Sequence, residues 1–272
     1  MAVNMTEQNL QDKLDRIQKK VEERSLSKEV KLPNWPEAKR GTPNSFLRSA
    51  LFSATQGKDD KDRPYLYGEI VASQEDIAIK FTGKQLNQDD LTLWEALVHL
   101  AKNEPLGNIC KFTAYSILQS MSLGAGGDER ERLHKGIIRL NACSVEISHN
   151  GSRVYFSSLI DSGAKDELTG YYTIQLNRQL IKLYSQTTWI DLEQRLQLRK
   201  KPLAQFLHGY YSSHKNPYPV KVKTLHNLSG SKNKRLSDFK QKVSAALDEL
   251  VQIEFLLNYS IDEDIVTVKR KN

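Results

Sequence analysis

The predicted secondary-structure elements of this chain follow an order that occurs twice. In both halves a helix is followed by a turn, a longer amphipathic helix and short strands that form a hairpin. The first half is expected to contain helix 44–55, a hairpin within 66–81, helices 91–103, 113–121 and 129–142, and strands 144–148, 153–160 and 171–176. The second half is expected to contain helices 178–184, 190–212, 221–228 and 232–251, and strands 253–258 and 264–269. A chain of 272 residues is long enough for two such units.

The last helix of each half carries a stripe of apolar residues. Leu133, Ile137 and Leu140 recur at helical spacing after a Gly-rich turn, and Asp128 is the expected N-cap. In the second half the stripe is formed by five residues: Leu236, Phe239, Val243, Leu247 and Leu250. Pro202 is expected to kink or interrupt the long helix that precedes this pair of helices.

The order helix, turn, longer helix and hairpin is the layout of a winged helix-turn-helix domain. We therefore predict an α+β fold, mostly helical, made of tandem winged-helix domains with short β-hairpin wings. The first domain is expected over 32–177 and the second, DNA-binding domain over 178–272. Residues 1–31 are expected to form a tail with an amphipathic helix over 7–24, whose apolar stripe docks either on its own domain or on a partner.

Positive charge is concentrated in one part of the chain. The whole sequence has a formal net charge of +7. Residues 32–189 hold 18 basic and 18 acidic side chains, whereas residues 195–242 hold 12 basic side chains and one acidic side chain, Asp238. A cluster of this kind is typical of a surface that binds a polyanion such as nucleic acid.

The candidate DNA-binding residues lie on both of the longer helices and around the second one. In the first half they are basic residues on the helix face opposite the apolar stripe: Arg132, Lys135 and Arg139. An ordinary solvated face is an equally good reading of these three, because Glu129 and Glu131 dilute the charge.

In the second half the candidates are basic residues suited to phosphates and polar residues suited to base edges: Arg199, Lys200, Lys201, Lys215, Lys221, Lys223, Ser231, Lys232, Asn233, Lys234, Arg235, Ser237, Gln241, Lys269 and Arg270.

Several kinds of catalytic site need spacings that this sequence lacks. Gly124-Ala125-Gly126-Gly127 has no following Lys, so it does not form a phosphate-binding loop of the Gly-x-x-x-x-Gly-Lys type. His208 and His214 are six residues apart on a predicted helix, so they point to different faces and cannot share a metal ion there. A strand-nicking enzyme would need such a metal pair beside a nucleophilic tyrosine such as Tyr210 or Tyr211. We expect no catalytic residue, no metal site and no cofactor.

The N-terminus does not predict export or membrane insertion. Met1–Leu10 is polar and no apolar segment of a signal peptide follows it. The longest apolar runs are far too short to span a membrane. The expected location is the cytoplasm, with no membrane partner.

Short strings along the chain resemble the TrfA family of plasmid replication initiators. Leu32–Ala38, Arg40–Asn44 and Leu47–Phe52 are similar to the start of that family, and further strings follow in the same order: Phe81–Gly83, Asp90–Ala96 and Phe112–Tyr115. The most specific string is Lys201-Pro202-Leu203-Ala204-Gln205-Phe206-Leu207-His208-Gly209-Tyr210-Tyr211-Ser212. The resemblance covers roughly residues 32–230.

The resemblance implies a plasmid-encoded bacterial protein with two winged-helix domains. Such a protein binds direct repeats, called iterons, in the double-stranded DNA of a plasmid origin and helps to open it, which makes single-stranded origin DNA a further ligand. It recruits the host initiator DnaA and the replicative helicase, with the sliding clamp as a further partner. It binds DNA as a monomer and self-associates into dimers that limit copy number. Gln85-Leu86-Asn87-Gln88 departs from the clamp-binding pattern Gln-Leu-x-Leu-Phe after two residues.

Two other functions fit parts of the sequence. A winged-helix transcriptional repressor would bind an inverted repeat as a symmetric dimer, so the geometry of the DNA site distinguishes it from an initiator. A strand-nicking initiator would be an enzyme, and the missing metal pair argues against it.

Overall fold

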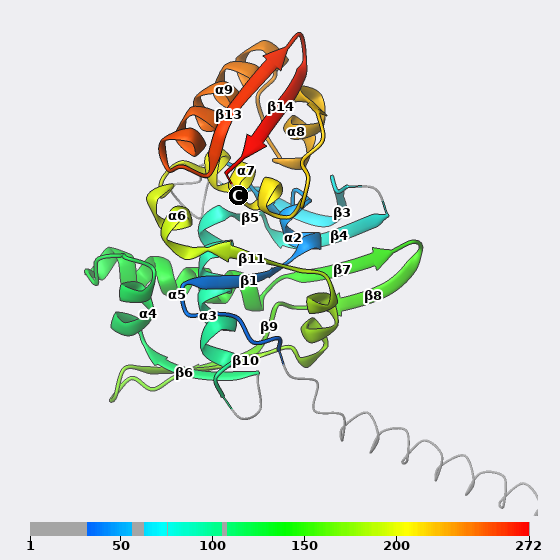
Figure 1. The fold of residues 1–272 in the computed structure, drawn as a ribbon. Coiled ribbons are helices and arrows are strands. Elements are labelled where there is room, and N and C mark those ends of the chain that lie inside the picture. The colour runs from blue at the N-terminus through cyan, green and yellow to red at the C-terminus, as the bar shows by residue number, and fades with distance from the viewer. Residues whose placement is uncertain (1–31, 56–62, 75, 105–107, 272) are drawn as a thin grey trace, which may run out of the picture. The chain divides into compact units, whose positions relative to one another are not determined.

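The computed structural model describes residues 32–55, 63–74, 76–104 and 108–271. The expected helix over 7–24 lies outside these residues. Residues from Leu32 onward form one compact unit. Its helices and strands are intermixed, which gives the α+β class that the sequence predicts (Figure 1).

The second half begins with a helix and ends with a hairpin. Its elements are α7 (Pro202–Ser212), β12 (Val220–Lys221), α8 (Val222–Leu228), α9 (Leu236–Gln252), β13 (Leu256–Asp262) and β14 (Ile265–Arg270). The short strand β12 pairs antiparallel with the last strand, which gives the sheet order β12-β14-β13. Figure 1 shows α9 beside this sheet.

The first half contains the same arrangement. The matching elements are α3 (Gln88–Ala101), β6 (Ile109–Thr113), α4 (Ala114–Ser120), α5 (Gly127–Asn141), β9 (Ile160–Lys165) and β10 (Tyr171–Leu176). Its sheet order is β6-β10-β9, so here too the strand before the helix pair is bonded to the last strand of the unit. The repeated order expected from the sequence is therefore present as a repeated topology.

Further strands surround the first of these two units. A four-stranded antiparallel sheet is made of β3 (Tyr65–Val71), β4 (Ile77–Lys84), β7 (Ser144–His149) and β8 (Ser152–Ser157). Two smaller pairs and three short helical elements complete the fold: β1 (Lys39–Pro43) with β11 (Thr187–Asp191), β2 (Phe52–Ser53) with β5 (Leu86–Asn87), α2 (Asn44–Leu47), η2 (Arg178–Ser185) and α6 (Leu192–Gln197).

Several predicted elements have different bounds in the structure. The helix expected over 44–55 ends at Leu47, and the chain continues into a short strand. The helix expected over 190–212 is strand β11 followed by two helices, and Pro202 is the first residue of the second of them. A proline is tolerated there because the first turn of a helix has no hydrogen-bond partner for that backbone nitrogen.

Other predicted details of the two helix-turn-helix segments also change. The turn expected over 161–170 contains most of β9. Helix α5 begins at Gly127, so Asp128 lies in its first turn and does not cap it. Helix α9 begins at Leu236, four residues later than predicted, so residues 232–235 lie in the turn before the helix.

Two hydrophobic cores support the two topological repeats. The first extends from Trp35 to Ile190, and the second from Leu198 to Val268. The division into domains 32–177 and 178–272 stays a prediction. The two cores are joined through a buried ion pair in which Arg195 Nε lies 2.9 Å from Glu95 Oε2, and both side chains are almost fully buried.

Candidate nucleic-acid interface

The turn between α8 and α9 is rich in exposed basic side chains. We call residues 231–235 the basic loop, because Lys232, Lys234 and Arg235 are all exposed there. Lys221 and Lys223, at the start of α8, are exposed as well. Among the described residues, these five cations form no ion pair within 4 Å. Their charge is therefore available to an external anion.

The structure corrects the position of the basic loop relative to α9. Arg235 is the residue that precedes the helix, and its side chain makes no capping hydrogen bond. Only Asp238 contributes charge in the first turn, where an acidic residue is favourable. The three cations thus lie on the loop that leads into α9, outside the first turn of the helix.

Gly230 places the basic loop against the first half of the molecule. Its φ of +62° belongs to the left-handed region, which glycine adopts without cost. A Cβ at this position would lie 2.9 Å from the Cβ of Ser53, so the site also has no room for a side chain. Next to it, Ala54 N donates to Ser229 O at 2.7 Å. The turn is therefore fixed by a backbone hydrogen bond to Ala54 and by close packing against Ser53.

Hydrogen bonds to α8 and α9 and within the loop itself also fix the basic loop. The Asn233 carbonyl oxygen lies 2.9 Å from His226 Nε2, and the Asn233 side-chain oxygen accepts from Lys242 Nζ at 3.0 Å. Asn233 N donates to Ser231 Oγ at 3.3 Å. Asn233 and Ser231, predicted to read bases, are thus engaged within the loop. His226 and Lys242 were missed, because their contacts depend on the path of the turn and leave no periodic signal in the sequence.

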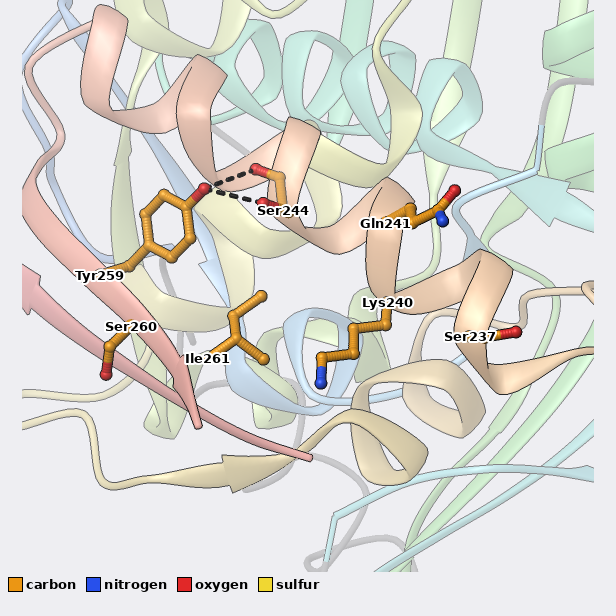
Figure 2. A pocket seen from close by; sticks show the side chains of 7 residues that line it. All are labelled: Ser237, Lys240, Gln241, Ser244, Tyr259, Ser260 and Ile261. Carbon is orange, nitrogen blue, oxygen red and sulfur yellow. Dashed lines mark hydrogen bonds between the residues drawn. The ribbon is translucent and has the colours of Figure 1, made fainter. Parts of the chain in front are cut away.

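Ser237 and Gln241 lie on the exposed face of α9. Figure 2 shows both at the rim of a shallow hollow between α9 and β13, which is also lined by Lys240, Ser244, Tyr259, Ser260 and Ile261. The Tyr259 hydroxyl donates to Asp248 Oδ1 at 2.7 Å and lies 2.9 Å from Ser244 Oγ. The Tyr259 hydroxyl and the Lys240 ammonium are thus engaged within the protein, and the exposed polar groups at the rim are those of Ser237 and Gln241.

Lys269 and Arg270 do not lie near the basic loop. Arg270 pairs in register with Leu256, and Lys271 N donates to Phe255 O, which places this end of β14 close to the C-terminal end of α9. The Arg270 guanidinium donates to His214 O at 3.1 Å and lies 5.2 Å from the Phe255 ring centroid. Burial lowers its pKa. Arg270 therefore has a structural contact, and the two residues lie at the end of the last strand. Their role in DNA binding stays a prediction.

The hairpin tip that does lie near the start of α9 is acidic. It consists of Asp262, Glu263 and Asp264, all exposed. Lys240 Nζ, from the second turn of α9, donates to the Glu263 carbonyl, and Val222 N donates to Asp264 O at 2.8 Å. The carboxylates are therefore close to the basic surface formed by the basic loop with Lys221 and Lys223.

Four further candidates lie in the segment around α7. The Arg199 guanidinium donates to the Ser122 carbonyl, and Lys201 pairs with Glu249 near the C-terminal end of α9. Lys200 and Lys215 are exposed. This set is spread over the connection between the two halves, and the structure does not bring Lys201 next to the basic loop.

The three candidates on α5 all have acidic neighbours. Arg132 Nη1 lies 3.1 Å from Glu129 Oε1, and Lys135 Nζ lies 2.7 Å from Glu131 Oε1, one helical turn away in each case. The Lys135 ammonium lowers the pKa of the Glu131 carboxyl through their hydrogen bond. Arg139 is nearly buried and its Nη2 lies 2.6 Å from Asp90 Oδ1. Arg139 therefore supports the packing of α5 on α3, and we leave it out of the proposed DNA-binding surface.

The tyrosines considered as nucleophiles are in the second core. Tyr210 and Tyr211 are buried, and burial raises the pKa of both hydroxyl groups. Across the described ranges, no group of three His, Cys, Asp or Glu residues is arranged to hold a metal ion. No described helix is long and apolar enough to cross a membrane.

Comparison with known proteins gives one family and several similar structures. The model of a family described as TrfA protein matches residues 1–270. The Escherichia coli plasmid replication initiator protein TrfA is 25% identical over 245 residues, which cover 87% of this chain and 63% of that protein. The chain thus spans less than two thirds of that relative.

Two solved structures match this chain, one of them with a TM-score above 0.5. Domains 2 and 3 of RctB match with a TM-score of 0.57 and 14% identity, over 84% of this chain and 98% of that chain. The Pi initiator protein in complex with iteron DNA matches with a TM-score of 0.48 and 14% identity, over 67% of this chain and 95% of that chain.

Proposed function

Because the chain belongs to the TrfA family, we propose that it initiates plasmid replication by binding repeated sites in double-stranded origin DNA. The observation that carries the proposal is the basic surface at the start of α9, where five exposed cations have no acidic partner among the described residues. The name of the Escherichia coli relative supports the role in initiation.

We propose that each topological repeat is a winged-helix unit. In such a unit the second helix of the pair enters the major groove, with its N-terminal end toward base edges. In this protein that helix is α9 in the second repeat and α5 in the first. Since only α9 is preceded by unpaired cations, the second repeat supplies most of the affinity, and Ser237 and Gln241 face the bases.

The remaining steps of initiation follow from the family resemblance. We propose that the protein binds iterons as a monomer in the bacterial cytoplasm and helps to open the adjacent duplex. It then recruits host DnaA and the replicative helicase, with the sliding clamp and single-stranded origin DNA as further ligands. Dimers limit copy number. We propose that the protein itself acts in these steps without hydrolysing a nucleotide.

Footprinting on the origin of the protein's own plasmid tests the proposal. We expect evenly spaced protection over direct repeats, with a site of about two helical turns for two winged-helix units. Binding should weaken with salt, with a slope of log K against log salt of about −4 to −5 if all five cations meet phosphates. Equal affinity for the origin and for random DNA would contradict the proposal, and protection of a single inverted repeat would favour a repressor.

A further inference from the structure

Asn233 is the residue around which the basic loop is organised. Three of its groups are bonded within the protein: the carbonyl oxygen to His226, the side-chain oxygen to Lys242 and the backbone N–H to Ser231. Its side-chain nitrogen is buried and has no hydrogen-bond partner among the described residues. The side chain on which a base contact was predicted therefore faces the protein.

His226 links the loop to both helices of the pair. The Asn233 carbonyl can only accept, so His226 Nε2 carries the hydrogen of this bond. The His226 ring also packs edge-on against Phe239, with centroids 4.9 Å apart at 87°. Phe239 is a buried residue of α9, and His226 belongs to α8. One imidazole thus fixes the loop relative to both helices.

Lys242 of α9 contacts the side chain of Asn233. It lies on the exposed part of α9, and its ammonium group is 3.0 Å from Asn233 Oδ1. We define His226, Asn233 and Lys242 as the loop clamp. Its members come from α8, from the loop and from α9, so the path of the loop depends on all three.

We propose that the loop clamp is a set of positioning residues for sequence-selective binding, an inference that rests on the DNA-binding function proposed above. Phosphate contacts need charge and tolerate movement, whereas base contacts need donors and acceptors held in place. The exposed side chains of Lys232, Lys234 and Arg235 are long and flexible, so a defined loop backbone limits where their charged groups can go. The clamp therefore acts on specificity and leaves the electrostatic part of binding alone.

The test compares His226→Phe with His226→Gln. Phenylalanine keeps a ring against Phe239 and removes the hydrogen bond, whereas glutamine restores an N–H donor near the position of Nε2. Neither variant changes the number of cations on the surface. Binding to a duplex with the origin repeats and to a random duplex is measured between 50 and 200 mM salt, together with the melting temperature.

We expect His226→Phe to lose about tenfold in affinity for the repeats, the size of one lost bidentate base contact. Its affinity for random DNA should change by less than about twofold, with the same salt slope, because the phosphate contacts remain. His226→Gln should recover the affinity for the repeats. A His226→Phe protein that binds repeats like the wild type would overturn the proposal, as would a parallel loss on random DNA, or failure of His226→Gln to recover at an unchanged melting temperature.

Failure of the loop clamp and failure of the proposed function give different results, and an Arg235→Ala variant serves as the control for a lost cation. That variant removes a cation and should weaken binding to both duplexes. If the wild-type protein shows no preference for the repeats, the proposed function fails. If the wild type prefers the repeats and His226→Phe behaves like it, only the loop clamp fails.

Discussion

Helices α5 and α9 occupy the same position in the two repeats, yet their surroundings differ in charge. Three basic side chains of α5, Arg132, Lys135 and Arg139, pair with acids on the same helix or on α3. The cations that precede α9 form no ion pair among the residues that the structure describes. The two sequences have similar numbers of basic residues here, so the number of cations alone does not identify a DNA-binding surface.

The same topology thus carries cations in two different electrostatic settings. A phosphate that approaches α5 must compete with carboxylates already paired to its cations, whereas the cations of the basic loop have no carboxylate within ion-pair distance among the described residues. We therefore expect the second repeat to supply most of the affinity for the duplex and the first repeat to supply less. The following changes test that difference, from the largest expected effect to the smallest.

The largest effect is expected from removing the unpaired cations together. Lys232→Ala, Lys234→Ala and Arg235→Ala in one protein should weaken duplex binding by about a thousandfold at 150 mM salt and reduce the salt slope by about 3. A matched triple variant of α5, with Arg130→Ala, Arg132→Ala and Lys135→Ala, should lose less than about tenfold, because Arg132 and Lys135 are already paired with carboxylates and Arg130 donates to the Ala125 carbonyl. Fluorescence anisotropy with an origin duplex measures both, and equal losses would refute the division between the repeats.

The sequence was sufficient to predict the repeated pattern and the basic region, but not the geometry of the turn. Apolar stripes at helical spacing identified α5 and α9, because burial on one face leaves a period in the sequence. The start of α9 was placed four residues too early, since Ser231 is a good helix cap and nothing local shows that residues 231–235 are bonded to His226 and Lys242 instead.

Pairings between distant segments were not predictable from local pattern. Strand β1 pairs with β11, about 150 residues later, so neither strand reads as part of a hairpin. Arg139 has the spacing of an exposed residue, and its partner Asp90 lies on another helix. Both contacts are set by how the helices pack, which a single sequence does not show.

The second largest effect is expected on stability and separates Arg139 from its neighbours. Asp90 is nearly fully buried between Arg139 and Arg63, with contacts of 2.6 and 2.5 Å. Arg139→Ala should lower the free energy of unfolding by about 3 kcal/mol, because it takes one partner from a buried carboxylate. Arg132→Ala, whose ion pair is exposed, should cost less than about 0.5 kcal/mol. Urea denaturation measures both, and similar costs would show that Arg139 is not structural.

The third prediction concerns how stability depends on pH, and it rests on buried histidines of α3 and α7, His99 and His208. Burial lowers the pKa of both, to about 3 for His208, while the Glu37 carboxylate opposes the shift at His99. The unfolded state takes up a proton below its ordinary pKa of about 6.5, whereas folded His208 stays neutral, so stability falls as pH drops.

For His208 this linkage predicts a loss of about 2 kcal/mol between pH 6.5 and pH 5. His208→Gln keeps a donor for Gln194 Oε1, which lies 3.2 Å from His208 Nε2, and removes the titrating group. Urea denaturation at pH 7, 6 and 5 should therefore show a shallower loss for this variant than for the wild type. Parallel pH profiles would contradict the prediction.

The smallest effect is expected at the acidic hairpin tip, which places like charge beside the basic loop. Asp262→Asn, Glu263→Gln and Asp264→Asn together should raise the affinity for random duplex DNA about fivefold at 100 mM salt, as expected for three carboxylates several ångströms from phosphates in water. The increase in affinity for the origin repeats should be smaller, because base contacts there already select one orientation of the protein. On random DNA the variant can also bind in orientations that bring the hairpin tip close to the phosphate backbone. Glu104→Gln, Glu167→Gln and Glu193→Gln change the net charge by the same amount away from the tip and should leave binding within about twofold. A weaker repeat complex in the tip variant would instead mean that a carboxylate accepts a hydrogen bond from a base, such as the cytosine amino group.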